Sequence, residues 1–463
     1  MIADLKPYAE YKESGLPWLG EVPSHWTVLP AFGAFKPNKD RNIGMKEKTV
    51  LSLSYGRIVI KPAEKLHGLV PESFETYQIV DPGDIVLRTT DLQNDHTSLR
   101  VGMVRNRGII TSAYLALRAL PGVNPDYGFQ FLNVWDYSKA IYGYGSGLRQ
   151  NLDFSHFKRM PIPIPPPAEQ AAIVRFLDWA NGRLERAIRA KRKVIALLNE
   201  QKQAIIHRAV TRGLAPNAPL KPSGIPWLGD IPAHWQIVRN MALFTHRVEA
   251  GIAGLPVLQV SLRSGITPED LDQFGRPKRL IADPTKYKRI YKDDVAYNTM
   301  RMWQGAVGVS PVDGLVSPAY VVLCPRSGIL PEFYDFIFHI DVYKQQVNRQ
   351  STGIVSDRNR LYWDNFKQMA NIVLPFSEQN AIVNFINSET SGLNAAKLNL
   401  QAEVELLREY RTRLVSDVVT GKLDVREAAS RLPCEELLLE ASIADDDLDV
   451  SADDLPFEQE ADA

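Results

Sequence analysis

Residues 168–214 read AEQAAIVRFLDWANGRLERAIRAKRKVIALLNEQKQAIIHRAVTRGL, and a related stretch occupies residues 377–423. Glu169-Gln170 in the first copy corresponds to Glu378-Gln379 in the second, 209 residues later. Apolar residues recur every seven positions in both copies, a spacing that gives a helix one apolar seam and is typical of coiled coils. The predicted seam residues are Leu177, Leu184, Leu198, Ile205, Ile386, Leu393, Leu400, Leu407 and Leu414.

Polar and helix-breaking residues interrupt this register at few points. We expect the stem of Lys191 to lie along the seam with its ammonium group in water. Gly182 and Ser391-Gly392 fall at the same point of the two copies, so we predict a short lead helix followed by a rod of about 30 residues, roughly 45 Å long at 1.5 Å per residue. The proline-rich stretches 160–167 and 369–375 mark where the helices begin. Such a seam is also compatible with an ordinary packed helix pair or a homodimer.

The duplication extends beyond the helices. Residues 14–26, SGLPWLGEVPSHW, reappear as SGIPWLGDIPAHW at residues 223–235, with the same offset and nine of 13 positions identical. The chain therefore contains two copies of a unit of about 200 residues. Proline, glycine and tryptophan at this density predict a turn-rich apolar plug, in which His25 and His234 satisfy local backbone groups.

Between plug and helix, each half contains short runs rich in Val, Ile, Leu and Tyr and bounded by Gly, Pro or Asp, which predict strands. These runs are Thr49–Tyr55, Asp84–Leu87, Gly108–Leu117, Val257–Leu262, Asp294–Tyr297 and Gly314–Leu323. We predict an α+β protein with two mixed α/β domains and two long helices. The expected boundaries are 1–167 and 215–376 for the domains, 168–214 and 377–424 for the helices, and 425–463 for a tail.

Charge is distributed unevenly along the 463 residues, although the net charge is zero. Residues 425–463 hold 2 Lys/Arg and 13 Asp/Glu, a net charge of −11, so residues 1–424 hold the other 52 Lys/Arg and 41 Asp/Glu and carry +11. A basic body predicts a polyanionic partner. An acidic end with few aromatic residues predicts a solvated, disordered tail.

Composition also predicts the compartment and limits the chemistry. With 45% apolar and 23% charged residues, the sequence is typical of a globular protein. The two cysteines, Cys324 and Cys434, are too few for a disulfide framework or a zinc site of their own. The amino-terminal residues lack the apolar core of a signal peptide, and the charge-free run 250–262 is too short to span a bilayer. We expect a cytoplasmic protein.

No catalytic motif is evident in the sequence. There is no Gly-x4-Gly-Lys-Ser/Thr phosphate-binding loop, and no Asn-Pro-Pro-aromatic tetrapeptide of amino-methyltransferases. Gly143, Gly145 and Gly147 are followed by polar residues and not by an apolar helix, which disfavours a dinucleotide or methyl-donor site. The eight histidines show no metal-ligand spacing.

Arginine and amide side chains, in contrast, gather in loops that follow apolar runs. Arginine pairs with guanine, and asparagine or glutamine with adenine, through two hydrogen bonds each in the major groove of DNA. We predict a DNA-binding surface made by these residues, although each taken singly could be an ordinary solvated loop residue. The candidates are Arg88, Thr90, Gln93, Asn94, Arg149, Gln150, Asn151, Asn298, Arg301, Gln304, Arg358, Asn359 and Arg360.

These features together resemble the specificity subunits of type I restriction-modification systems. The resemblance rests on the duplicated Ser-Gly-x-Pro-Trp-Leu-Gly-x-x-Pro-x-His-Trp, on PPAEQAAI at residues 166–173, and on Leu-Leu-x-Glu at 197–200 followed by AVTRGL at 209–214. In the second half, NTMRMWQG at 298–305 and GLVSPAY at 314–320 are similar to a common type of target recognition domain. The resemblance covers residues 11–424, and the acidic tail departs from it.

The resemblance implies two target recognition domains held apart by two long helices that pair as an antiparallel intramolecular coiled coil, with pseudo-twofold symmetry. It implies that each domain reads one half of a bipartite double-stranded DNA sequence. It also implies a non-catalytic subunit that binds no cofactor. Its partners would be two modification subunits, which use S-adenosylmethionine, and restriction subunits, which use ATP and Mg²⁺. A coiled-coil scaffold without DNA specificity and a fragment of an enzyme are the alternatives.

Overall fold

The computed structural model describes residues 5–62, 73–90, 92, 99–144, 151–225, 228–262, 265–268, 283–352 and 359–433. The chain forms two compact units. Unit 1 contains residues 1–190 and 404–463, and unit 2 contains residues 191–403. Each unit therefore combines one mixed domain with a part of both long helices. Among the described residues, no helix is long and apolar enough to cross a membrane.

The two long helices are continuous. Helix α4 spans Pro167–Arg212 and helix α9 spans Phe376–Val419. Both begin at the proline-rich stretches, as predicted, because proline fits the first turn of a helix. The predicted break at Gly182 and Ser391-Gly392 is wrong. One glycine costs a helix interior about 1 kcal/mol, which the buried side chains on either side, such as Ala180 and Leu184, outweigh.

Within each unit the two helices contact each other through ion pairs and hydrogen bonds. In unit 1, Arg411 Nη1 lies 3.0 Å from Glu185 Oε2. In unit 2, the ammonium group of Lys191 pairs with Glu403 of α9, and both side chains stay partly exposed to solvent. Farther along α4, Lys397 Nζ donates to Asn199 Oδ1 and Lys202 Nζ donates to Asn394 Oδ1. Because the α9 partner number falls as the α4 number rises, the helices of unit 2 run antiparallel.

The predicted seam residues differ in burial along the helices. Some are buried and the others are half-buried. Buried are Leu177, Leu184, Ile386 and Leu414, and half-buried are Leu198, Ile205, Leu393, Leu400 and Leu407.

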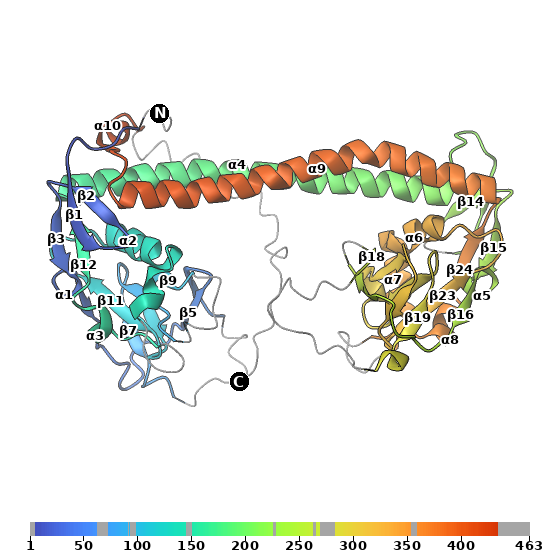
Figure 1. Ribbon diagram of the computed structural model, residues 1–463, viewed down its shortest axis with the longest axis horizontal. Helices are drawn as coiled ribbons and strands as arrows, with labels where there is room; N and C mark the ends of the chain where they lie inside the picture. Colours follow the sequence, from blue (N-terminus) through green and yellow to red (C-terminus); the bar gives the residue numbers. More distant parts are fainter. Residues whose placement is uncertain are drawn as a thin grey trace. The chain divides into compact units, whose positions relative to one another are not determined.

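Unit 1 is built from short antiparallel strands around a four-stranded sheet of order β4-β11-β8-β9. Two strands of this sheet, β11 and β9, are labelled in Figure 1. The strands of this sheet are β4 (Phe35–Pro37), β11 (Leu115–Ala119), β8 (Ile85–Leu87) and β9 (Val101–Met103). The two-stranded sheets join β1 (Tyr11–Leu16) to β2 (Gly20–Pro23), β3 (Thr27–Pro30) to β12 (Pro161–Ile164), β5 (Leu51–Ser54) to β6 (Arg57–Ile60), and β7 (Gln78–Val80) to β10 (Gly108–Ile110). The helices of the domain are α1 (Ala31–Ala34), α2 (Pro125–Tyr137), η3 (Ala140–Tyr144) and α3 (Phe154–Phe157).

Unit 2 repeats this topology. Its central sheet has the order β16-β23-β20-β21, formed by β16 (Phe244–Arg247), β23 (Tyr320–Pro325), β20 (Val295–Asn298) and β21 (Val307–Val309). A second sheet joins β18 (Gly265–Pro268), β17 (Val257–Ser261), β22 (Gly314–Val316) and β19 (Lys288–Ile290). Two pairs complete the set, β13 (Leu220–Pro222) with β14 (Asp230–Pro232) and β15 (Gln236–Arg239) with β24 (Ala370–Val373). The helices are α5 (Asn240–Leu243), η4 (Pro284–Lys286), η5 (Met302–Gln304), α6 (Pro331–His339), α7 (Asp341–Gln350) and α8 (Trp363–Phe366).

Two predicted strands are each divided by a turn. The run Gly108–Leu117 forms β10 and β11, and the run Gly314–Leu323 forms β22 and β23. In the first turn the N–H of Tyr114 donates to the carbonyl of Thr111, and in the second the N–H of Tyr320 donates to the carbonyl of Ser317. A hydroxyl at the first position of each turn also accepts a backbone N–H, so the local polar side chain competes with strand pairing.

The predicted tail begins too early in the sequence. Residues 425–433 are folded, with helix α10 at Arg426–Ser430. Val425, Ala429 and Leu432 are buried in the core of unit 1, and Arg175 Nη2 donates to the carbonyl of Leu432. These apolar side chains interrupt the acidic sequence and pack against unit 1. Residues 434–463 of the predicted tail lie outside the described residues.

Candidate nucleic-acid interface

A buried glutamate fixes the apolar plug of unit 1 to the start of α4. Glu169 Oε1 accepts hydrogen bonds from Trp26 Nε1 at 2.9 Å and from the Tyr8 hydroxyl at 2.6 Å. The His25 ring lies 2.8 Å from Glu169 Oε2, so the predicted role of this histidine, bonding to local backbone, is wrong. Its partner lies 144 residues away and is acidic, and a sequence pattern alone does not reveal it.

Unit 2 contains the same arrangement with one member fewer. His234 lies 2.8 Å from Glu378 Oε2, and Trp235 Nε1 donates to Glu378 Oε1 at 3.0 Å. No tyrosine among the described residues donates to this carboxylate in the way that Tyr8 donates to Glu169. The Glu378 side chain is accordingly more exposed, at 26%, than that of Glu169, at 4%.

The glutamine that follows each glutamate binds the loop that leads into a helix of the mixed domain. This helix is α2 in unit 1 and α6 in unit 2. Gln170 Nε2 donates to the carbonyl of Gly122, and its Oε1 accepts from the N–H of Asn124. Gln379 makes the same two bonds, to Gly328 and Leu330. The duplicated Glu-Gln pair is therefore structural, since it anchors each mixed domain to its helix.

Two of the predicted segments meet at one edge of the central sheet in each unit. In unit 1 the N–H of Leu152 donates to the carbonyl of Thr89 at 2.8 Å, which joins the loop after β8 to the residue that follows Asn151. In unit 2 the N–H of Leu361 donates to the carbonyl of Thr299 at 2.9 Å, which joins the loop after β20 to the residue that follows Arg360. The structure thus places Arg88 and Thr90 beside Asn151, and it repeats the arrangement in the second copy.

In unit 2, the loop after β20 is a closed turn that leaves polar side chains outside. Asn298 Oδ1 accepts from the N–H of Met300, and the N–H of Ala306 donates to the carbonyl of Arg301. Gly305 ends η5 with a φ of 95°, which disfavours any side chain at that position. Arg301 and Gln304 are exposed on this turn, so their side chains are available to a partner.

The second segment of unit 2 adds two more of the predicted residues. Asn359 Nδ2 donates to Asn348 Oδ1 at the end of α7, at 3.0 Å. Arg360 is exposed and pairs with Thr352 as an isolated β-bridge. Five predicted residues, Gln93, Asn94, Arg149, Gln150 and Arg358, lie outside the described residues.

A buried arginine that no sequence pattern indicates supports the corresponding loop in unit 1. Arg100 is 1% exposed, and its Nη1 donates to the carbonyls of Thr90 at 2.9 Å and Arg88 at 3.3 Å. Its guanidinium lies over the ring of Tyr142, 5.9 Å from the centroid. Its own N–H donates to Asp136 Oδ2, and burial raises the pKa of the Asp136 carboxyl above its usual range. Arg100 therefore positions the loop from beneath.

The opposite ends of the same strands carry the acidic residues. Asp84 precedes β8 and accepts Arg118 Nε at 2.7 Å, while Asp294 precedes β20 and accepts Arg247 Nε at 2.8 Å. Both carboxylates are buried and neutralised by these ion pairs. An anionic partner that approaches the carboxyl ends of β8 and β20 therefore meets arginine and amide side chains. The carboxylates of Asp84 and Asp294 lie at the amino ends of these strands.

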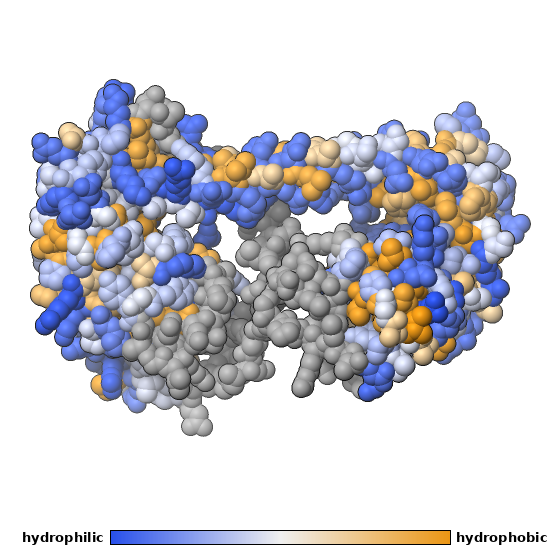
Figure 2. All heavy atoms as spheres, in the orientation of Figure 1, coloured by the Kyte–Doolittle hydropathy of each residue, from blue (hydrophilic) through white to orange (hydrophobic). Residues whose placement is uncertain are grey.

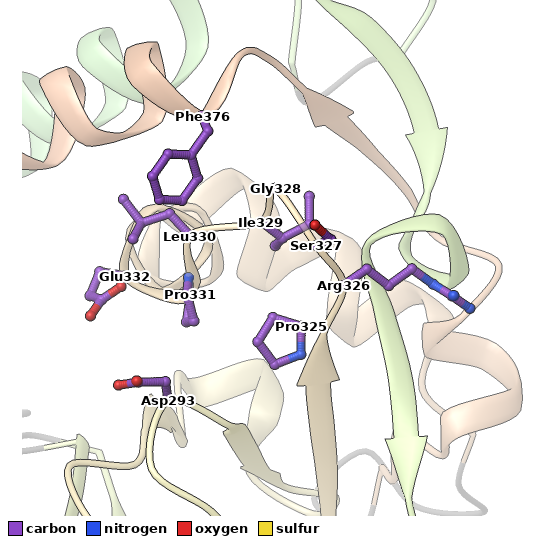
Figure 3. Close-up of a pocket in the computed structure, with 10 residues that line it drawn as sticks. All are labelled: Asp293, Pro325, Arg326, Ser327, Gly328, Ile329, Leu330, Pro331, Glu332 and Phe376. Atoms are coloured by element: carbon purple, nitrogen blue, oxygen red, sulfur yellow. The ribbon is translucent and has the colours of Figure 1, made fainter.

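A hollow of about 400 Å³ lies in unit 2 near the acidic strand end (Figure 3). It lies between Asp293, the loop from Pro325 to Glu332, and Phe376 at the start of α9. Gln379 binds this loop through the carbonyl of Gly328. Asp293 lies before the start of β20, whereas Asn298 of the polar loop lies at its end. The hollow is thus separate from the polar strand-end loops. Among the described residues, no cluster of three or more His, Cys, Asp or Glu could hold a metal ion.

Apolar side chains are exposed between hydrophilic ones along both long helices (Figure 2). In unit 2 they include Val194 and Leu197 of α4 and Leu398 of α9, and in unit 1 they include Leu406 and Tyr410 of α9. The predicted seam residues are less exposed than these.

Comparison with solved structures identifies proteins of similar fold. No family model matches the chain. One similar chain comes from a structure described as "Structural basis underlying complex assembly and conformational transition of the type I R-M system". It aligns with a TM-score of 0.57 and 14% identity, over 87% of this chain and 99% of that one. This similarity shows a shared fold.

Two further structures align less closely. The HsdS subunit from Thermoanaerobacter tengcongensis has a TM-score of 0.41 and 13% identity over 87% of this chain and 98% of that one. The type I restriction-modification system S subunit from M. genitalium has a TM-score of 0.33 and 12% identity over 85% and 96%.

Proposed function

We propose that this chain is the DNA-binding specificity subunit of a type I restriction-modification complex. The observation that carries the proposal is the repeated junction of the two polar loops, through Leu152 and Thr89 in one unit and Leu361 and Thr299 in the other. Two equivalent polar surfaces in one chain match a partner that presents two recognition sequences. The similarity in fold to a chain of a type I R-M structure supports the same partner.

Each unit would read one half of a bipartite site on double-stranded DNA. Arg88 and Asn151 of unit 1, and Arg301, Gln304 and Arg360 of unit 2, are exposed side chains that would contact base edges or phosphates. The long helices would pair as an antiparallel coiled coil between the two recognition domains. The ion pairs of Glu185 with Arg411 and of Lys191 with Glu403 support this pairing.

The chain itself would be non-catalytic and would bind no cofactor. Methyl transfer would belong to two modification subunits that use S-adenosylmethionine, and cleavage to restriction subunits that use ATP and Mg²⁺. Exposed apolar residues of the long helices, such as Leu197 and Leu398 in unit 2, would contact the modification subunits.

Methylome sequencing of the host, with the gene intact and deleted, tests this function. We expect one bipartite methylated motif, with two specified halves and an unspecified spacer, that disappears on deletion and returns on complementation. An unchanged methylome, with a purified chain that shows no sequence-dependent affinity in the presence of modification subunits, would favour a scaffold without DNA specificity. Methylation or cleavage by the purified chain alone would favour an enzyme.

A further inference from the structure

A hairpin beside the unit 1 loop carries an exposed aromatic residue in an unfavourable backbone conformation. Strands β5 and β6 pair from Leu51 opposite Ile60 to Ser54 opposite Arg57, so Tyr55 and Gly56 form a two-residue turn. Their φ angles are 45° and 77°, as a type I′ turn requires. Asparagine or glycine is favoured at the first of these positions, yet Tyr55 occupies it with its side chain 61% exposed.

The hairpin packs against the central sheet. A Cβ atom on Gly102 of β9 would lie 2.5 Å from Leu53 Cδ1 and 2.9 Å from Ile58 Cδ1, so these two side chains would have to shift if residue 102 carried a side chain. The turn itself also lies close to the sheet, because a Cβ on Gly56 would lie 3.6 Å from the Val101 carbonyl and 3.7 Å from Leu99 Cβ. Packing of the hairpin on residues 99–102 therefore sets the position of Tyr55.

This turn is continuous with the candidate interface. Leu99, which the turn contacts, immediately precedes Arg100, whose guanidinium donates to the carbonyls of Arg88 and Thr90. Leu99 and Val101 thus lie against the Tyr55 turn, and Arg100, between them, holds the strand-end loop. A molecule that contacts Arg88 is within reach of the hairpin tip.

The charge of the hairpin fits a polyanion. Residues 48–62 contain Lys48, Arg57 and Lys61, all exposed, and no aspartate or glutamate. An aromatic tip flanked by cations suits double-stranded DNA, because cations contact phosphates while an apolar side chain contacts base edges or inserts between base steps.

In unit 2 the β17–β18 hairpin packs on the central sheet in the same way. A Cβ on Gly308 of β21 would lie 2.9 Å from the Ile266 nitrogen of β18, so glycine again allows the hairpin to pack closely. Leu262 follows β17 at the tip of that hairpin and is 42% exposed. The remaining tip residues, 263 and 264, lie outside the described residues.

We propose that Tyr55 is a DNA-contacting residue, presented by the β5–β6 hairpin to the base pairs next to those that the Arg88 loop faces. This inference rests on the proposed function and adds a second reading element to unit 1. Because an apolar side chain that contacts base edges or inserts between base steps adds to the phosphate contacts, loss of the ring should weaken binding by about tenfold or more. Because the turn favours glycine, removing the side chain should not destabilise the fold.

Three variants of the chain, assembled with its modification subunits, test this role. Binding is measured by fluorescence anisotropy on a duplex that carries the motif found by methylome sequencing, and each variant chain is also melted. We expect Tyr55→Gly to bind at least about tenfold more weakly with an unchanged or higher Tm, and Tyr55→Phe to bind within about threefold of the wild type. Phe32→Ala, an exposed aromatic of α1 outside the hairpin, should bind like the wild type.

Several outcomes would overturn the proposal. Wild-type affinity of Tyr55→Gly would exclude a DNA contact, and a lower Tm would assign the ring a packing role. Failure of Tyr55→Gly to assemble with the modification subunits would make the tip a protein contact. If the wild-type complex does not distinguish its motif from a scrambled duplex, the proposed function itself fails, before any variant is compared.

Discussion

The indole of Trp26 donates a 2.9 Å hydrogen bond to the carboxylate of Glu169, and the two residues lie 143 positions apart in the sequence. Trp235 and Glu378 repeat this bond at 3.0 Å in unit 2. In both units, a residue of the plug is thereby fixed to the first turn of a long helix. The carboxylate of Glu169 or Glu378 thus anchors the mixed domain of its unit to the long helix, next to the glutamine that makes the second anchor.

Glu169→Gln should therefore destabilise unit 1 by about 2 kcal/mol, because hydrogen bonds to a charged acceptor contribute about 1.5–3 kcal/mol when buried. Glu378→Gln should cost about 1 kcal/mol, since that carboxylate is more exposed and lacks a tyrosine donor. Urea unfolding of the full chain, with the exposed Glu389→Gln as a control on α9, measures both. Equal losses in the two variants would contradict the role given to Tyr8 and to burial.

Arg100→Met should impair reading by unit 1 alone. Without the guanidinium, the carbonyls of Arg88 and Thr90 lose a buried charged donor, so the loop no longer has one fixed conformation. We expect at least about tenfold weaker binding to the intact motif, and loss of discrimination in one half-site only. Competition with duplexes mutated in either half measures this, and the exposed Arg105→Met serves as the control. Equal loss at both half-sites would mean that Arg100 acts on general stability.

Asp136→Asn should change the pH dependence of stability in a defined direction. Burial raises the pKa of Asp136 in the folded state, so its protonated form favours folding below the unfolded pKa of about 3.9, and this contribution is lost as pH rises through the folded pKa. The wild type should gain stability relative to Asp136→Asn as pH falls through that window. Thermal melting of both chains between pH 3.5 and 7 measures the difference. A constant difference across this range would refute the raised pKa.

Binding should also be strongly salt-dependent. Residues 1–424 carry a net charge of +11, and each neutralised phosphate releases counterions. We expect the affinity of the assembled complex for its motif to fall at least about a hundredfold between 50 and 200 mM salt. Anisotropy titrations at four salt concentrations give the slope. A flat response would show that the basic residues do not contact phosphates.

The sequence indicates local features of this fold more reliably than long-range contacts. The helices and their proline-marked starts follow from the seven-residue pattern and from Pro166-Pro167 and Pro375. The predicted break at Gly182 failed, because packing along a long helix outweighs the local cost of one glycine. The partner of His25 and the bond from Leu152 to Thr89 join residues far apart in sequence, which no local pattern indicates.

Arg100 shows why part of the candidate site could not be predicted. The stretch Val101-Gly102-Met103 has a counterpart in Val307-Gly308-Val309, but the residue before it is Arg100 in one half and Ala306 in the other. In unit 2 the N–H of Ala306 bonds to the loop carbonyl of Arg301, so no buried cation is needed there. A comparison of the two halves therefore does not reveal the arginine. Its burial becomes evident only in the folded unit.

The division of reading between the two units is tested most directly by exchanging one recognition domain. Residues 27–150 are replaced by the corresponding stretch of a homologous chain with a different motif, and the methylated sequence is mapped by single-molecule sequencing of cells that express the hybrid. We predict a motif in which one half is new, while the other half matches that of the parent. A motif changed in both halves, or in neither, would contradict the assignment of one half-site to each unit.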